Sequence, residues 1–292
     1  MAQGISLHLG LNEVNPLAYD GQWQGKLMGA VADAQDMHAI AQAQGFQARL
    51  LLNEQATRSN LLAVLTEASR SLIAGDMFFL SFAGHGGKLP DLSGDESDGI
   101  DETWCLYDGQ FLDDELTLAW LHYAQGVRIL VVSDSCYSGT ITRGQAGVPR
   151  AMPRQVVRAT WRQQQAFYRQ IKNALPKTEW GELPLNSRDD VVNTPLLSSL
   201  APKNTGVTSR TRPKATVRLL AACAEGQMAL DGKENGLFTK TLKAVWKNGQ
   251  FSGNYASFYN QLYQLLQSQQ TPQYTGLGAE DRSFDAKQPF QI

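Results

Sequence analysis

Continuously apolar runs alternate with amphipathic segments along most of the chain. Runs of this kind are typical of parallel strands that are covered by helices on both faces. They occupy residues 5–11, 46–52, 77–83, 128–133 and 216–222. Helical spacing of apolar residues predicts helices over residues 29–44, 57–71, 113–123, 236–247 and 255–267, with Thr57 as an N-cap. The alternation predicts an α/β fold with a mostly parallel central sheet of about six strands, flanked by helices on both faces.

One region, residues 141–215, breaks this alternation. It contains several prolines, no clear strand, and thirteen of the 26 lysines and arginines of the chain. A helix is expected over residues 154–172, and the rest predicts a long basic connection within a single domain that covers residues 1–292. A connection of this length inside a compact domain is usually functional or disordered. A solvated insertion is the alternative.

Composition excludes several classes of protein. The net charge of −2 gives no bulk attraction to nucleic acid. Three cysteines form no disulfide framework, so Cys105 and Cys223 are expected to be buried thiols. The first residues lack the basic and apolar regions of a secretory signal, and no apolar stretch is long enough to span a bilayer. We therefore expect a cytoplasmic protein with neither a nucleic-acid partner nor a membrane partner.

Two of the apolar runs end in turns that carry reactive side chains. His85 follows the run 77–83 and Cys136 follows the run 128–133. The carboxyl ends of parallel strands meet at one edge of a sheet, where an imidazole can take the proton of a thiol and later protonate a leaving amine. The amides of Gly86 and Cys136 are candidates for oxyanion donors. Taken singly, a cysteine is more often a small core residue and a histidine more often structural.

The two motifs resemble those of a known family. S-F-A-G-H-G-G at 81–87 and D-S-C-Y-S-G-T at 134–140 are similar to the histidine and cysteine motifs of metacaspases and their prokaryotic relatives in the caspase-like clan. Weaker similarity covers residues 29–34, 221–227 and 236–242. The resemblance implies a caspase-like fold and a cysteine endopeptidase, with Cys136 as nucleophile and His85 as general base and acid.

The resemblance also implies a division of the chain. Residues 1–140 correspond to the large-subunit part and residues 216–292 to the small-subunit part, and the intervening linker is where relatives cleave themselves after lysine or arginine. Several basic residues of the linker are candidate cleavage points, and the sequence does not choose among them. They are Arg143, Arg150, Arg154, Lys172, Lys177 and Arg188.

Two carboxylates predict the specificity. Strand alternation places Asp134 on the same side as Cys136, and a carboxylate there favours a cationic side chain. The resemblance places Asp33 in the same pocket, which implies polypeptide substrates with arginine or lysine at P1. Ala30 and Ala83 stand where the family usually has cysteine and serine, so the pocket lining differs from the usual pattern.

Residues 91–115 form a second acidic region, with ten carboxylates and no lysine or arginine. A solvated, turn-rich loop with Asp113 or Asp114 capping a helix is one interpretation. Calcium, which prefers oxygen ligands, is the other. The resemblance matches Asp101, Asp113 and Asp114 to calcium ligands, but Arg143 stands at a fourth ligand position. No cofactor is required for the chemistry, and calcium is a candidate activator.

Two alternatives to the peptidase remain open. The first is a catalytically silent scaffold or regulatory binding module with a caspase-like fold. The second is a thiol-dependent peptide ligase, which would use the same two side chains. We expect a monomer in either case.

Overall fold

The computed structural model describes the chain except for residues 1, 91–99, 137–147, 175–211 and 225–226. The candidate cleavage points Arg143, Lys177 and Arg188 therefore lie outside the described residues, as does the first part of the acidic region. The strands are β1 (Gly4–Gly10), β2 (Gln47–Leu52), β3 (Met77–Ala83), β4 (Gly86–Pro90), β5 (Ile100–Leu106), β6 (Gly109–Leu112), β7 (Arg128–Asp134), β8 (Val148–Pro149), β9 (Thr216–Ala221), β10 (Leu230–Asp231) and β11 (Gln273–Gly278). The α-helices are α1 (Ala30–Ala43), α2 (Arg58–Ser71), α3 (Asp113–Trp120), α4 (Arg154–Ala174), α6 (Leu237–Trp246), α7 (Tyr255–Leu266) and α8 (Arg282–Ala286).

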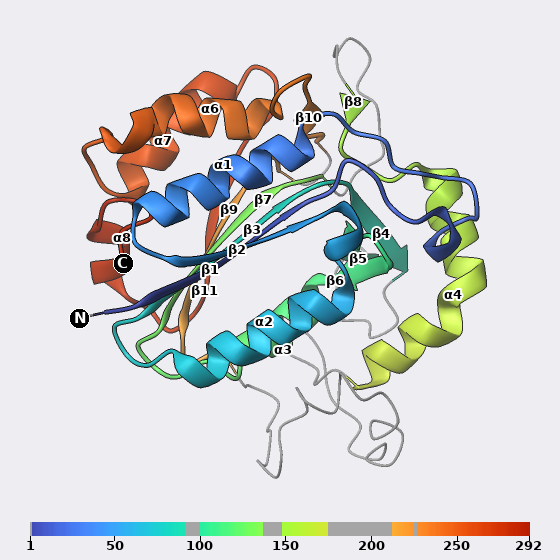
Figure 1. Cartoon of the computed structure of the whole chain (residues 1–292), viewed down its shortest axis with the longest axis horizontal. Coiled ribbons are helices and arrows are strands. Elements are labelled where there is room, and N and C mark those ends of the chain that lie inside the picture. Colours follow the sequence, from blue (N-terminus) through green and yellow to red (C-terminus); the bar gives the residue numbers. More distant parts are fainter. Residues whose placement is uncertain (1, 91–99, 137–147, 175–211, 225–226) are drawn as a thin grey trace.

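The central sheet has six strands in the order β11-β9-β7-β3-β1-β2. The pairs from β2 through β9 are parallel, and only β11 at the edge is antiparallel to its neighbour. Helices α1, α6 and α7 cover one face and helices α2 and α3 the other (Figure 1). The predicted mostly parallel six-stranded α/β architecture is therefore confirmed.

The core divides into two clusters on the two faces of the sheet. Side chains of β3 and β7 alternate between them: Leu80 faces the cluster under α2 and α3, and Phe79 faces the cluster under α1, α6 and α7. This alternation follows from the period of two along a strand. It explains why the strands read as continuous apolar runs, since both faces are buried.

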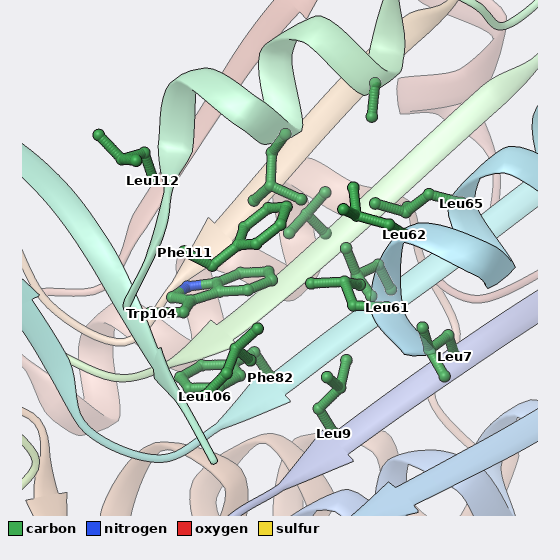
Figure 2. Packing of buried hydrophobic residues seen from close by; sticks show 14 of the residues in the cluster. Leu7, Leu9, Leu61, Leu62, Leu65, Phe82, Trp104, Leu106, Phe111 and Leu112 are labelled. Atoms are coloured by element: carbon green, nitrogen blue, oxygen red, sulfur yellow. The ribbon is translucent and has the colours of Figure 1, made fainter. Parts of the chain in front are cut away.

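A small antiparallel sheet of order β4-β5-β6 supports the ends of the central strands. Its anchor is Trp104, whose ring stacks on Phe82 of β3 with centroids 4.6 Å apart (Figure 2). The indole N–H of Trp104 also donates to Ser133 of β7 at 3.1 Å, and Ser133 is hydrogen-bonded to Ser135. Because Trp104 is buried between the strands that precede His85 and Cys136, it fixes both strand ends against one support.

Most predicted elements are confirmed, and the differences have physical causes. Thr57 caps α2 by accepting from the Asn60 amide, and α1 ends just before Gly45, whose φ of 87° stops a helix. The interpretation of residues 100–112 as a solvated loop is wrong, because they form β5 and β6. Helix α3 begins at Asp113, and the Glu115 carboxylate accepts from the Leu112 amide in the cap, so neither predicted aspartate is the cap. Cys105 and Cys223 are buried thiols, as expected.

Candidate active site

The two sequence motifs lie at adjacent strand ends. β3 and β7 are paired in parallel, with Ala83 opposite Asp134, so His85 and Cys136 each follow the sheet by two residues. The Gly84 amide donates to the Asp134 carbonyl at 3.4 Å, which extends this pairing by one residue. Both side chains are buried, with 5% of His85 and 0% of Cys136 exposed.

A segment of the chain's own linker lies over these strand ends. β8 pairs antiparallel with β10, placing Pro149 opposite Leu230. The Arg150 amide donates to Ala229 at 3.0 Å, and the Met152 amide donates to Gly86 at 2.7 Å. Residues 148–152 are thus held in extended form from both sides by backbone hydrogen bonds, as peptides are when they add a strand to a sheet.

The carbonyl of Arg150 lies where the sequence predicted an oxyanion site. Its oxygen accepts from the Gly86 amide at 2.9 Å and from the Cys136 amide at 3.2 Å. Two donors from two different strand ends therefore converge on one carbonyl. Such an arrangement polarises the carbonyl and can stabilise the negative charge that develops when a nucleophile adds to it.

The guanidinium of Arg150 fills a buried pocket lined by three carboxylates. Its Nη2 lies 2.5 Å from Asp33 Oδ2 and 2.8 Å from Asp231 Oδ1, and its Nη1 lies 3.1 Å from Asp134 Oδ2. The Arg150 side chain is wholly inaccessible to solvent. We call Asp33, Asp134 and Asp231 the arginine pocket. Burial alone would lower the pKa of the Arg150 guanidinium, but the charges of the pocket carboxylates outweigh it and raise that pKa.

Backbone and polar donors from the late part of the chain hold the carboxylates in place. The Gly236 amide donates to both oxygens of Asp33 at 3.1 Å, and the Thr239 hydroxyl donates to Asp134 at 2.7 Å. Burial raises the pKa of Asp33 to about 6, with Arg150 opposing this shift and Asp134 adding to it. Burying an ionised carboxylate costs free energy and favours its protonated form. Here the charge of Arg150 and the hydrogen-bond donors offset part of that cost.

His85 is a neutral imidazole in this arrangement. Burial and then the positive charge of Arg150 lower its pKa to about 4, whereas Asp231 and the backbone at Gly25 and Ala151 act in the opposite direction. The ring packs edge-on against Trp23 with centroids 5.0 Å apart. Neither ring nitrogen has a hydrogen-bond partner among the described residues. A neutral imidazole with a free lone pair is the form that can act as a base.

The Cys136 thiol lies among weak partners. It approaches the Ala229 carbonyl at 3.9 Å and lies beside the thiol of Cys223, whose own pKa is raised first by this contact and then by burial. The interpretation of Cys223 as a simple core thiol therefore misses its place next to the candidate nucleophile. Ser135, the residue before Cys136, is hydrogen-bonded to Ser133, and Ser133 accepts from the indole N–H of Trp104.

The candidate calcium residues lie elsewhere, on the small sheet and at the start of α3. Burial and then the charges of Asp114, Glu102 and Asp101 raise the pKa of Asp113. We call these four residues the acidic group. Within the described ranges, no three such side chains are arranged as a metal site. The described residues of the acidic group therefore do not make a complete calcium site by themselves, and no step of the chemistry below depends on the ion.

The structure brings five of the predicted site residues together and leaves three apart. His85, Cys136, the amide of Gly86, Asp33 and Asp134 all contact or face the Arg150 segment, whereas Asp101, Asp113 and Asp114 lie in the separate acidic group. Sequence reasoning missed Asp231 at the end of β10, Gly236 at the N-cap of α6, and Thr239 within α6. The polar, glycine-containing stretch 231–236 directly before an amphipathic helix was the available signal.

These features define an α/β protein with cysteine and histidine at adjacent strand ends and an acidic pocket beside them. The family model described as "Caspase domain" matches residues 14–282, and the chain belongs to this family. It is a metacaspase-like member. It is 39% identical to metacaspase-1B of Aspergillus fumigatus over 89 residues, which are 29% of this chain and 22% of that protein.

A second fungal relative and a solved structure extend the comparison. Metacaspase-1 of Emericella nidulans is 33% identical over 137 residues, covering 42% of this chain and 34% of that protein. The chain thus spans about a third or less of the length of these curated relatives. The crystal structure of protein GSU0716 from Geobacter sulfurreducens is 38% identical, covers 99% of both chains and superposes with a TM-score of 0.82. Together with the family model over residues 14–282, this likeness confirms the predicted caspase-like fold. In the described part of the chain, no helix has the length and apolar character needed to cross a bilayer.

Proposed function

We propose that this protein is a cysteine endopeptidase that cleaves after arginine or lysine, and that its first substrate is its own Arg150–Ala151 bond. One observation carries the proposal. The carbonyl of Arg150 accepts from the amides of Gly86 and Cys136 while its guanidinium lies between Asp33 and Asp134. A P1 residue of a bound peptide would need the same contacts. Of the candidate cleavage points in the described residues, Arg150 is the one with this environment.

The chemistry uses groups already in contact with the segment. His85 takes the thiol proton of Cys136, and the sulfur adds to the carbonyl carbon of Arg150. The oxygen becomes an oxyanion held by the amides of Gly86 and Cys136. The bond from Arg150 to the Ala151 nitrogen then breaks, and His85 returns its proton to that nitrogen. The Gly86 amide donates to the Arg150 carbonyl and the Met152 amide donates to the Gly86 carbonyl, so Ala151 is held next to the residue that follows His85, which supports this transfer.

Hydrolysis completes the cycle. Water gives a proton to His85 and its hydroxyl to the thioester carbonyl, and the Cys136 sulfur leaves and recovers the proton from His85. The products are a chain ending in the carboxylate of Arg150 and a chain beginning with the amine of Ala151. If that amine or another amine attacked the thioester instead of water, the same residues would give ligation.

Peptide hydrolysis tests the enzymatic part of the proposal. We expect the wild type to cleave peptides with arginine or lysine at P1, and Cys136→Ala to be inactive, with hydrolysed rather than ligated products by mass. Full activity of Cys136→Ala would overturn the mechanism. Cleavage after aspartate but not after arginine would overturn the pocket assignment. Absence of activity in the wild type on all these peptides would favour the scaffold alternative.

Self-cleavage is tested within the linker itself. We expect Arg150→Ala to abolish cleavage at this bond. The matched control Arg154→Ala changes an exposed arginine four residues later in the same linker and should leave the cleavage intact. Equal cleavage of both variants at residue 150 would contradict the assignment. Cleavage that is lost only in Arg154→Ala would do the same.

Calcium activation stays a prediction. Burial is the first cause of the raised pKa of Asp113 and the neighbouring carboxylates are the second, and a bound cation would relieve their mutual repulsion. Added calcium should speed self-cleavage of the wild type and have no effect on Asp113→Asn. Equal rates in calcium and in a chelator would remove calcium from the account without affecting the peptidase proposal.

A further inference from the structure

We propose that Asp231 is a specificity-determining residue that makes the site select arginine over lysine at P1. The inference rests on the proposed endopeptidase function and extends it. Asp33 and Asp134 contact only the terminal nitrogens of Arg150. Asp231 differs because it lies along the side of the guanidinium, at the nitrogen closest to the aliphatic chain.

The contact geometry shows this difference. Asp231 Oδ1 accepts from Arg150 Nε at 3.3 Å and from Nη2 at 2.8 Å, so one carboxylate oxygen spans two adjacent donors of the guanidinium. Asp33 Oδ2 accepts from Nη2, and Asp134 Oδ2 lies 3.1 Å from Nη1. The three carboxylates together surround all three nitrogens of the side chain.

A lysine cannot reproduce the Asp231 contact. Its side chain places a methylene group where arginine has Nε, and a methylene donates no hydrogen bond. Its single ammonium stands where arginine has the central carbon, short of both terminal nitrogens. The planar fork of arginine donates in several fixed directions, whereas an ammonium is a compact point charge. Lysine would therefore keep the long-range attraction of the pocket and lose the side contact.

Asp231 is held in the orientation that this contact needs. Its Oδ2 accepts from the Met28 amide at 2.7 Å, and its Oδ1 also accepts from the Gly29 amide at 3.1 Å. These two amides precede α1, the helix that carries Asp33. The carboxylate is 2% exposed, so water does not screen it. An asparagine in its place cannot satisfy both sides, because its NH₂ group would face either a backbone amide or the guanidinium.

A pair of matched peptides, identical except for arginine or lysine at P1, tests the inference on the self-processed enzyme. We expect the wild type to prefer arginine by at least about tenfold in kcat/KM. Asp231→Asn should lower the arginyl value by about ten- to a hundredfold, the effect of losing a hydrogen bond to a charged group, and the lysyl value by much less. Asp285→Asn is the matched control. It removes a carboxylate from the Arg218 pair outside the pocket and should change neither value.

A second variant avoids dependence on the folding of Asp231→Asn. Arg150→Lys keeps all three carboxylates and changes only the cis substrate, and it should slow self-cleavage by about tenfold or more. Equal wild-type rates on the two peptides, equal losses on both in Asp231→Asn, or unchanged self-cleavage in Arg150→Lys would each overturn the role of Asp231. A wild type that cleaves neither peptide would instead refute the proposed function on which it rests.

Discussion

Two groups of carboxylates lie in this molecule, a buried one in the arginine pocket and a mostly half-buried one in the acidic group, and their charges are balanced in different ways. In the arginine pocket, three aspartates from distant parts of the chain surround one guanidinium and accept from backbone amides. In the acidic group, the side chains come from one stretch of the chain, and burial followed by their mutual repulsion raises the pKa of Asp113. The contrast shows that a pocket for a cation depends on convergence in space more than on the density of acids in the sequence.

The largest expected effect comes from removing a charge at the base of the arginine pocket. Asp33→Asn leaves the buried guanidinium with one fewer anion, and breaking a buried pair typically costs about 3–5 kcal/mol. We expect self-cleavage at Arg150 to slow by at least about a hundredfold. The rate is measured from intact mass over time.

The corresponding change in the acidic group is the control for that experiment. Asp113→Asn removes a half-buried carboxylate that does not contact Arg150, and without calcium it should leave the rate of self-cleavage within about threefold of the wild type. Equal losses in the two variants would mean that the arginine pocket has no special role.

A steric change at Gly236 tests binding of arginine in the pocket without altering any charge. A Cβ on Gly236 would lie 2.7 Å from the Arg150 Cζ, although Gly236 has an ordinary backbone conformation that alanine can adopt. Gly236→Ala should therefore fold and yet exclude the guanidinium, at a cost of about 1–3 kcal/mol from overpacking. We expect cleavage of arginyl peptides to fall by about ten- to a hundredfold. Unchanged kcat/KM would show that arginine does not bind against this backbone.

The pH dependence of cleavage separates the pocket from the dyad. The pKa of Asp33 is about 6 and that of His85 is about 4 with the segment bound. Ionised Asp33 favours the guanidinium, so activity should rise as pH increases through about 6, while His85 is already neutral there. The rate of self-cleavage, followed from pH 4 to 8, should show this limb in the wild type and lose it in Asp33→Asn. A limb that persists in the variant would assign it to another group.

The smallest expected effect concerns stability at the acidic group. Because the folded-state pKa of Asp113 is raised, its contribution to stability is fully present below the unfolded pKa of about 4 and is lost as pH rises through the folded value. Asp113→Asn carries no ionisable group and should flatten this slope, raising the melting temperature by a few degrees, on the order of 1 kcal/mol, at neutral pH. A lower melting temperature at neutral pH would contradict the repulsion.

Features set by local sequence patterns could be predicted from the sequence, whereas features that depend on convergence in space could not. Strands β1, β3 and β7 were predictable because both their faces are buried, and His85 and Cys136 followed from the ends of β3 and β7. Asp134 followed from strand alternation relative to Cys136, whereas Asp33 required the family resemblance. Asp231 was missed because its position depends on β10 pairing with β8, two residues each, which no local pattern encodes.

Arg150 was one of six basic candidates in the linker and could not be singled out. Its neighbours in the sequence differ little in charge or hydropathy from those of the others. What distinguishes Arg150 is its position in space. It lies fourteen residues after Cys136 in the sequence, yet its carbonyl accepts from the Cys136 amide. The small sheet β4-β5-β6 was missed because this part of the sequence is acidic and rich in turn residues. Its inner face nevertheless carries Trp104 and Phe111, which pack into the core.

The proposed self-cleavage requires that the peptide bond after Arg150 is presented to Cys136 of the same molecule. The most direct measurement is the new N-terminus and the rate of cleavage of the purified chain over a range of dilutions. We predict fragments 1–150 and 151–292, a first-order rate that does not change with protein concentration, and no cleavage in Cys136→Ala. A new N-terminus other than Ala151, or a rate that falls in proportion to dilution, would contradict it.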